Sequence, residues 1–278
     1  MELRARDLSI PLDRVAMMGV LNVTPDSFSD GGLWLDPDAA VKHGIEMAEH
    51  GAAIIDVGGE STRPGAEPVP EDEELHRIIP VIQGLAADGR VVSVDTRKPT
   101  VAEAAVEAGA VIVNDTSGEA FDPAMGDVAA RTGAAVVIMH SRGTPATMRS
   151  LTDYSEVVND VVGFLRERAQ SLEQSGIGRE RIALDPGIGF AKTPRQSLEL
   201  LNRLDELVAT GYPVVVGTSR KSFIGAVLDL PEDRRIEGTA ASVAIAVWKG
   251  AHMVRVHDVE EMTRIVRMTE ALLHPEEW

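Results

Sequence analysis

A repeated alternation of strand and helix constrains the fold of this chain more than any other feature. A short apolar run ends in a glycine or a polar residue, a helical stretch follows it, and this unit occurs eight times along 278 residues. Nearly continuous apolar strands separated by helices are typical of a parallel sheet that helices cover. Eight such units predict an α/β protein with a single domain, a (β/α)8 TIM barrel. An open doubly wound sheet remains the alternative, because periodicity does not show closure. The predicted strands are 15–21, 53–57, 91–94, 111–113, 134–139, 182–184, 214–216 and 253–256.

Helical stretches with apolar residues at helical spacing lie between the predicted strands. They are 38–50, 70–88, 98–108, 123–132, 154–175, 194–210, 219–228, 239–249 and 259–273. We therefore expect one barrel domain at 15–278, preceded by an N-terminal extension at 1–14. The longer loops, 24–37, 61–70, 141–153 and 187–193, all follow strands. Because the active site of such a barrel is built from the loops after its strands, we expect the functional site on that face.

Charge and composition exclude several classes of function. The formal net charge of −17 predicts a poor general binder of nucleic acid and of anionic membranes, so any bound anion must be held by a few local cations. The chain has no cysteine, which excludes disulfides and thiolate metal sites and fits a reducing compartment. The N-terminus has no apolar core segment, and no apolar run approaches the about 20 residues needed to cross a bilayer. P-loop, G-x-G-x-x-G and H-E-x-x-H motifs are absent. We therefore expect a cytoplasmic protein that does not associate with membranes or nucleic acid.

Polar side chains follow five of the predicted strands and would converge on one mouth of the barrel. They are Asn22, Asp95, Asn114, Asp185 and His257. A solvated surface charge would explain any one of them, but five together predict a pocket rich in hydrogen-bond acceptors. A carboxylate accepts two parallel N–H bonds, so Asp95, Asn114 and Asp185 are predicted to hold a planar heterocycle that carries N–H donors.

Positive charge is predicted beside these acceptors. Lys221 lies in the segment 219–222, whose two cations and two hydroxyls are predicted to open a helix, where unpaired N–H groups favour a carboxylate or a phosphate. Arg255 and His257 lie two residues apart and should point the same way. Arg63 adds a cation in the loop after the second predicted strand. These residues predict an anion site next to the acceptor-rich pocket.

Two of the strand-end residues have a simpler interpretation. Arg255 is equally well explained as an ion pair inside the barrel, with Asp258 or Glu60 as its partner. His140 ends another predicted strand, but one imidazole without a spaced partner is weak evidence for a metal site.

Six motifs at these strand ends and loops resemble the dihydropteroate synthase family. They are N-V-T-P-D-S-F-S-D-G-G at 22–32, D-V-G-G-E-S-T-R-P-G at 56–65, N-D-T-S-G at 114–118, D-P-G-I-G-F at 185–190, G-T-S-R-K-S-F at 217–223 and V-R-V-H-D-V at 254–259. The resemblance covers nearly the whole chain. It implies an enzyme that joins 4-aminobenzoate to 6-hydroxymethyl-7,8-dihydropterin diphosphate, giving 7,8-dihydropteroate for folate synthesis and releasing diphosphate.

The resemblance also implies a role for each matching residue. Asp95, Asn114, Asp185 and Lys221 would hold the pterin, and Asp95, Asp185 and Lys221 would be the catalytic residues. Asn22, Arg255 and His257 would hold diphosphate, with Mg²⁺ bound through Asn22. Thr62, Arg63, Phe190 and Ser222 would surround the aminobenzoate. The family is expected to form homodimers. The apolar face of residues 239–248, which carries Ala240, Val243, Ala244 and Val247, is equally well explained as the dimer interface or as ordinary barrel packing. The loops 24–37 and 62–70 are expected to act as lids.

Two alternatives to this enzyme remain at the level of sequence. A methyltetrahydrofolate:corrinoid methyltransferase would share the pterin-binding barrel but would need no aminobenzoate site, so the intact S-T-R-P-G and S-R-K-S-F segments count against it. A non-catalytic pterin-binding paralogue would be favoured by a degraded anion site, and here that site is intact. Ser141, Arg142 and Arg97 depart from the family pattern and are expected to alter loop contacts only.

Overall fold

A sheet of eight parallel strands forms the centre of the molecule in the computed structural model, which describes residues 1–24, 36–61 and 65–277. Hydrogen bonding orders its strands β8-β7-β6-β5-β4-β3-β10-β9. A parallel bridge between Leu184 and Val214 joins the two end strands and closes the sheet into a barrel. The predicted (β/α)8 barrel is therefore confirmed. The strands are β3 Ala16–Asn22, β4 Ile54–Gly58, β5 Val92–Asp95, β6 Ile112–Asp115, β7 Ala135–Met139, β8 Ile182–Asp185, β9 Val215–Gly217 and β10 Met253–Val256.

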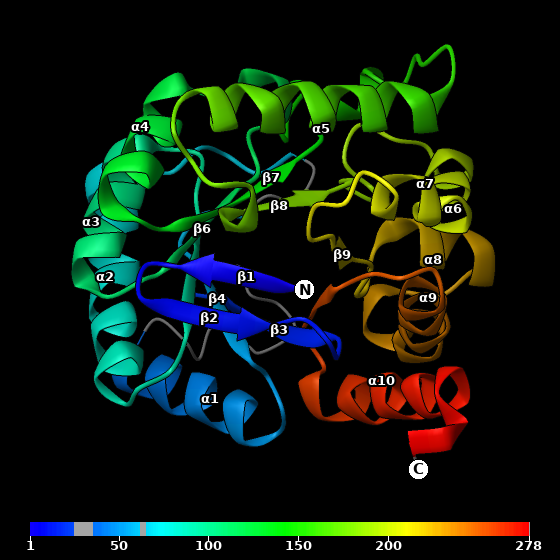
Figure 1. Cartoon of the computed structure of the whole chain (residues 1–278), viewed down its shortest axis with the longest axis horizontal. Coiled ribbons are helices and arrows are strands. Elements are labelled where there is room, and N and C mark those ends of the chain that lie inside the picture. Colours follow the sequence, from blue (N-terminus) through cyan, green and yellow to red (C-terminus); the bar gives the residue numbers. More distant parts are fainter. Residues whose placement is uncertain (25–35, 62–64, 278) are drawn as a thin grey trace.

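Helices form a ring around the strands (Figure 1). They are α1 Pro37–Glu49, α2 Glu71–Ala87, α3 Pro99–Ala108, α4 Pro123–Thr132, α5 Val157–Gln174, α6 Pro194–Asn202, α7 Leu204–Val208, α8 Ser222–Leu228, α9 Ile236–Trp248 and α10 Val259–Leu273. Local sequence explains several starts, since Asp36, Asp122 and Thr193 cap α1, α4 and α6 just before a proline at the first helical position. Short 3₁₀ turns lie at Gly118–Ala120, Met148–Ser150, Arg179–Arg181, Glu232–Arg234 and Pro275–Glu277. Within the described ranges, no helix is long and apolar enough to cross a membrane.

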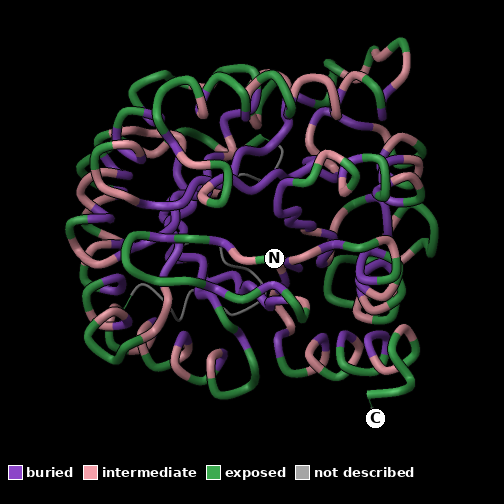
Figure 2. The backbone as a smooth tube through the Cα atoms, viewed as in Figure 1, coloured by how far each residue is buried: buried purple, intermediate pink, exposed green. Residues whose placement is uncertain are grey.

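An antiparallel hairpin of β1 (Glu2–Ala5) and β2 (Leu8–Pro11) lies across one end of the barrel (Figure 1). Its buried residues Leu3 and Ile10 pack with Met18, Ile112 and Met253 at the beginnings of the barrel strands. The larger apolar core lies between the sheet and the helices, so burial is concentrated at the strands and the inner helix faces (Figure 2). The hairpin therefore seals the end of the barrel opposite the loops that follow the strands.

The structure differs from the predicted elements at several places, of which four bear on the site or on the ends of the barrel. The stretch predicted as one helix at 194–210 divides into α6 and α7 at Arg203, whose φ of −109° interrupts the helix. The helix predicted from residue 219 begins only at Ser222, because Arg220 has a left-handed φ of 58° and its N–H donates to Thr239 Oγ1 at 3.1 Å. The helix predicted from residue 239 begins three residues earlier, as α9. The hairpin within 1–11 carries no predicted strand, because Glu2, Arg4 and Ser9 interrupt its apolar residues and neither strand is a continuous apolar run.

Candidate active site

A narrow cavity opens among the carboxyl ends of the barrel strands. The structure brings into it most of the strand-end residues singled out from the sequence. Its polar lining includes Asp95, Asn114, Asp185, Lys221, Arg255 and His257. A wider mouth continues from it and is lined by Asn22, Phe190, Ser222 and the same Lys221, Arg255 and His257. The hydrogen-bond acceptors therefore lie at the deep end of the cavity, and the cations lie between the deep end and the mouth.

A hydrogen-bonded network of charged side chains crosses the barrel beneath this cavity. Arg255 donates through Nε to Asp56 Oδ2 at 2.6 Å and through Nη2 to Asp95 Oδ2 at 2.7 Å. Asn114 Nδ2 donates to the same Asp56 oxygen at 3.0 Å, and Thr116 Oγ1 donates to Asp95 Oδ1 at 3.3 Å. The network fixes the orientation of four residues that line the cavity, Asp95, Asn114, Thr116 and Arg255.

The alternative interpretation of Arg255, an ion pair inside the barrel, is confirmed, but the partners expected for it are wrong. Asp258 pairs with Arg220, at 2.5 Å from Nη2 to Oδ1, and Glu60 pairs with Arg97 and with Lys98. The partner that sequence reasoning missed is Asp56, which is fully buried in β4. A carboxylate inside the apolar run Ile54–Gly58 was the available signal, because a buried charge needs a partner.

Burial governs how the three predicted catalytic residues ionise. It raises the pKa of Asp95 to about 7, a rise that Arg255 opposes and the neighbouring Asp56 increases. Burial also raises the pKa of Asp185, against the hydrogen bond from Gly187 N–H and the charge of Lys221. The pKa of Lys221 is lowered to about 8 by burial and then by the positive charge of Arg255. Shifted carboxyl and amine groups in one cavity are a signature of a functional site.

Phe190 and Ser222 lie where the cavity widens toward its mouth. Lys221 Nζ lies 3.8 Å from the centre of the Phe190 ring, a cation–π contact that joins the loop after β8 to the loop after β9. Ser222 is exposed at the first position of α8, and Lys221 occupies the N-cap position. At the other side of the mouth, His257 Nδ1 lies 3.0 Å from Ser219 Oγ.

Thr62 and Arg63 lie outside the described residues, as do residues 25–35 and 64 of the two predicted lids. The described end of the second loop has contacts of its own. Gly65 N–H donates to Pro145 O at 3.0 Å, and Val69 N–H donates to Glu60 Oε2 at 3.1 Å. The loop after β4 is thus tied both to its own start and to the loop after β7.

The residues that depart from the family pattern take part in such loop contacts. Arg142 lies over the Tyr154 ring, with 3.8 Å from its guanidinium carbon to the ring centre, and donates to Asp153 O at 2.7 Å. Arg97 donates to Glu60, and Ser141 is buried. His140 is buried too, and its Nδ1 lies 3.0 Å from the ammonium of Lys192, a residue for which the sequence suggested no role.

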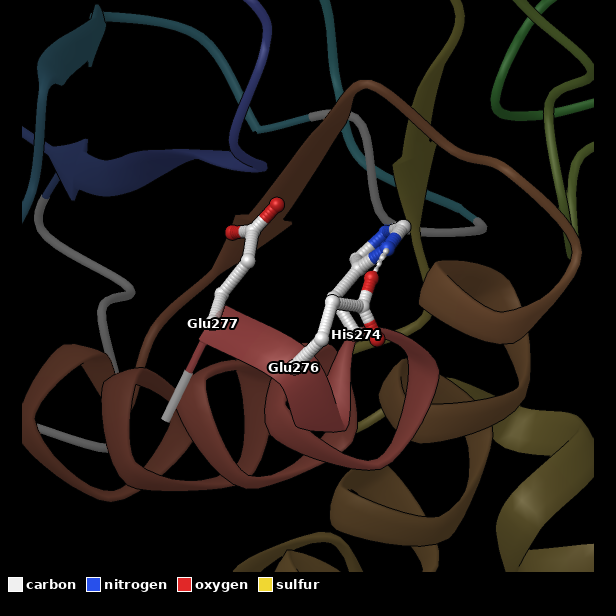
Figure 3. A group of neighbouring side chains, drawn as sticks. All are labelled: His274, Glu276 and Glu277. Atoms are coloured by element: carbon white, nitrogen blue, oxygen red, sulfur yellow. Dashed lines mark ion pairs between the residues drawn. The ribbon is translucent and has the colours of Figure 1, made fainter.

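Only one group of three carboxylate or imidazole ligands in the described part of the chain is close enough to share a metal ion. It consists of His274, Glu276 and Glu277, all exposed (Figure 3). Glu277 already pairs with Arg14, at 2.5 Å from Nη2 to Oε2, and Arg14 shortly precedes β3. This group therefore lies at the hairpin end of the barrel, away from the cavity, and Asn22 is the metal-ligand candidate at the mouth.

Comparisons with known proteins agree with this geometry. A family model described as "Pterin binding enzyme" matches residues 18–257. The dihydropteroate synthase of Bacillus subtilis (strain 168) is 47% identical over 263 residues, which are 94% of this chain and 90% of that protein. The crystal structure of Yersinia pestis dihydropteroate synthase with a sulfonamide drug complex superposes with a TM-score of 0.94 at 41% identity, covering 98% of this chain and 99% of that one. The Thermus thermophilus enzyme in complex with 4-aminobenzoate superposes with a TM-score of 0.88 at 43% identity, covering 98% of this chain and 100% of that one.

Proposed function

The chain belongs to the dihydropteroate synthase family of pterin-binding enzymes, and from this premise we propose that it joins 4-aminobenzoate to 6-hydroxymethyl-7,8-dihydropterin diphosphate. The products are 7,8-dihydropteroate, an intermediate of folate synthesis, and diphosphate. The enzyme is a transferase of an alkyl group other than methyl. The observation that carries the proposal is the cavity itself, in which buried acceptors lie below a mouth lined by cations.

The deep end of the cavity suits the pterin ring. Asp95, Asn114 and Asp185 offer carboxylate and amide oxygens to ring N–H groups, and the Lys221 ammonium donates to a ring acceptor. Their hydrogen bonds within the protein support this assignment, because Asp95 and Asn114 are both oriented by the network around Asp56 and Arg255. A site that is oriented before the ligand arrives loses less free energy on binding.

The reaction breaks one bond and forms another at the pterin methylene carbon. The C–O bond to diphosphate breaks, and its electron pair leaves with the diphosphate oxygen. The conjugated ring and the Asp95 and Asp185 carboxylates stabilise the methylene cation that remains. The aniline nitrogen attacks that carbon and then loses one proton, so no serine or cysteine nucleophile takes part.

Asn22, Arg255 and His257 would hold the diphosphate at the mouth. The residues present also fit Mg²⁺, because this ion takes oxygen ligands, keeps several waters and is commonly held by one or two protein oxygens together with substrate phosphates. The Asn22 amide oxygen would be its protein ligand. When bound, Mg²⁺ supplies positive charge that stabilises the leaving diphosphate.

The aminobenzoate is assigned to the outer part of the mouth. Phe190 would stack on its ring, and Ser222 would meet its carboxylate at the beginning of α8. Thr62 and Arg63 are assigned to the same subsite from their motif. Because Phe190 contacts Lys221, the subsite for the second substrate adjoins the pterin pocket directly.

The decisive experiment measures diphosphate release by the purified chain with the pterin diphosphate, Mg²⁺ and 4-aminobenzoate, each omitted in turn. We expect dihydropteroate only when all three are present. Tight pterin binding without product would replace this proposal with a non-catalytic pterin-binding protein. Corrinoid-dependent demethylation of methyltetrahydrofolate would replace it with the methyltransferase.

We also propose that the chain is a cytoplasmic homodimer. Val243 and Val247, which the sequence suggested for the interface, are buried in the barrel core. Other large apolar side chains of the adjoining helices α8, α9 and α10 are exposed and suit a second copy of the chain; they are Val227, Leu228, Ile245, Trp248, Met268 and Leu272. We expect light scattering to give twice the 29.8 kDa chain mass, and Trp248→Glu to shift it toward the monomer. A wild-type monomer would contradict the proposal.

A further inference from the structure

The side chain of Lys192 is buried beneath the loop 186–191, which follows Asp185 at the end of β8 and carries Phe190. Only 8% of this lysine is exposed. Its Nζ lies 2.9 Å from Phe190 O, 3.0 Å from Gly187 O, 3.2 Å from His140 O and 3.0 Å from His140 Nδ1. An ammonium has three N–H donors, and here four acceptors surround it.

These acceptors are all formally neutral. Burial lowers the pKa of His140 to about 2, so its imidazole is uncharged and its Nδ1 accepts a hydrogen bond. Among the described residues, no carboxylate lies within 4.0 Å of Nζ to pair with it. An isolated buried ammonium is costly, and burial accordingly lowers the pKa of Lys192 to about 7.

The side chain of Lys192 contacts the loop 186–191 at two backbone carbonyls. Gly187, Gly189 and Ala191 all have left-handed φ, at 64°, 82° and 48°. A Cβ at Gly187 would lie 1.9 Å from His140 O, so the loop packs directly on the end of β7. This backbone turns the Gly187 and Phe190 carbonyls toward one point, and Nζ occupies that point.

The same loop connects Lys192 to the cavity on two sides. The N–H of Gly187 donates to Asp185 Oδ1 at 2.7 Å, so the residue whose carbonyl binds Lys192 also orients the carboxylate. Phe190, whose carbonyl binds Lys192, carries the ring that contacts Lys221. Lys192 itself does not line the cavity.

We propose that Lys192 is a positioning residue of the pterin site: its ammonium holds the loop after β8 so that Asp185 and Phe190 are in place before the pterin binds. This role rests on the proposed function, since the ligand is the pterin substrate. The charges facing Asp185 are Lys192, Lys221 and Arg255, and each favours its ionised form. Those facing Lys192 are Asp185, Lys221 and Arg142.

The test compares Lys192→Met with Arg181→Met. Methionine keeps most of the length of lysine but removes the donors and the charge. Arg181 is a matched control because it precedes the same strand, β8, at the other end of the barrel, and also donates to two backbone carbonyls, Ala129 O at 2.5 Å and Ala134 O at 2.8 Å. Calorimetry measures the Kd of the pterin diphosphate with Mg²⁺ and without 4-aminobenzoate, and thermal melting measures the stability of each variant.

We expect Lys192→Met to weaken pterin binding about tenfold or more, and Arg181→Met to leave the Kd within about twofold of the wild type, even where both lower Tm. We also expect the loss of binding at acid pH to move to higher pH in Lys192→Met, because removal of a nearby positive charge makes Asp185 harder to ionise. Lys192→Gln keeps N–H donors but not the charge. It should therefore bind the pterin more tightly than Lys192→Met, while its binding should still be lost at a higher pH than that of the wild type. This variant also serves if Lys192→Met does not fold.

A wild-type Kd and pH profile in both Lys192 variants would overturn the inference. Equal loss of affinity in Lys192→Met and Arg181→Met would also overturn it, because Lys192 would then act through stability alone. If the wild-type chain binds the pterin but makes no dihydropteroate, the proposed reaction fails while the Kd comparison still decides the role of Lys192. If the wild-type chain does not bind the pterin, both proposals fall.

Discussion

Asp56 connects two residues of the cavity lining without reaching the cavity. One carboxylate oxygen accepts from both Arg255 and Asn114, and the other has no hydrogen-bond partner among the described residues. A fully buried carboxylate in this state is held by the charge of Arg255. The role of Asp56 is therefore to position the guanidinium of Arg255 and the amide of Asn114. Asparagine, which has the same shape without the charge, tests this role.

We predict that Asp56→Asn reduces kcat/KM for the pterin diphosphate about 10- to 100-fold, from the loss of a hydrogen bond to a charged group worth about 1.5–3 kcal/mol. Arg255 would keep only Asp95 as its ionic partner. Steady-state kinetics measures the change, and thermal melting reports whether the fold persists. Asp205→Asn, which removes an exposed carboxylate paired with Lys249, should leave kcat/KM unchanged. Wild-type kinetics in Asp56→Asn would remove Asp56 from the site.

Asp95 links the pH dependence of stability to the site. Because burial raises its folded-state pKa to about 7, above the ordinary value of 3.8, the folded protein binds this proton more tightly than the unfolded chain. The stabilisation from the protonated carboxyl is fully present below pH 3.8 and is lost as pH rises through about 7. Asp95→Asn removes this titration.

We therefore predict that the free energy of unfolding of Asp95→Asn rises by about 1–3 kcal/mol relative to that of wild type between pH 5 and pH 8, so that the variant gains relative stability. Urea denaturation of both proteins at the two pH values measures it. The variant should also bind the pterin weakly, so stability and function change in opposite directions. A difference in stability that stays constant with pH would show that Asp95 has an ordinary pKa.

At the scale of elements, the connection between β9 and α8 depends on a neighbouring helix. Arg220 adopts a left-handed conformation, and its N–H donates to Thr239 Oγ1 in α9 at 3.1 Å. Its guanidinium pairs with Asp258 at the beginning of α10, and its carbonyl accepts from Arg235 Nη1 at 2.9 Å. These contacts place Lys221 and Ser222 beside the cavity. The helices α9 and α10 therefore help to shape the loop between β9 and α8, although the loop belongs to neither helix.

We predict that Thr239→Val destabilises the protein by about 1–2 kcal/mol and raises the KM for 4-aminobenzoate, because the Arg220 N–H loses its acceptor and the loop that carries Ser222 shifts. Denaturant unfolding and steady-state kinetics measure the two effects. Thr269→Val is the control: Thr269 is also buried in a helix, but its hydroxyl donates only to Ile265 O in α10. An unchanged KM in Thr239→Val would show that α9 does not position the loop.

At the scale of the whole molecule, the two ends of the barrel have different roles: residues at one end stabilise the fold, and residues at the other end form the functional site. The end covered by the β1–β2 hairpin is apolar, with Leu3 fully buried against the barrel interior. The other end holds the charged network and the cavity. A change at the hairpin should therefore alter stability and leave the chemistry intact.

We predict that Leu3→Ala lowers the free energy of unfolding by about 2–5 kcal/mol with little change in kcat or KM below the melting temperature. Leu8→Ala on the same hairpin should have almost no effect, because Leu8 is 46% exposed. Differential scanning calorimetry and steady-state kinetics at low temperature separate the two outcomes. A large loss of kcat in folded Leu3→Ala would contradict the separation of the two ends.

The sequence by itself determined the alternation of strands and helices and most of the polar cavity lining. Apolar runs and helix caps act over a few residues, and in a closed barrel every strand ends on the same face, so the amino-acid order alone assigns Asn22, Asp95, Asn114, Asp185 and His257 to one mouth. Tertiary structure alone decided which of these groups touch. The partners of Arg255, Asp56 and Asp95, lie 199 and 160 residues away along the chain, and Lys192 lies 52 residues from His140. Nothing local specifies such pairs, because burial and the closure of the barrel bring them together; the left-handed turn at Arg220 likewise depends on Thr239, 19 residues later.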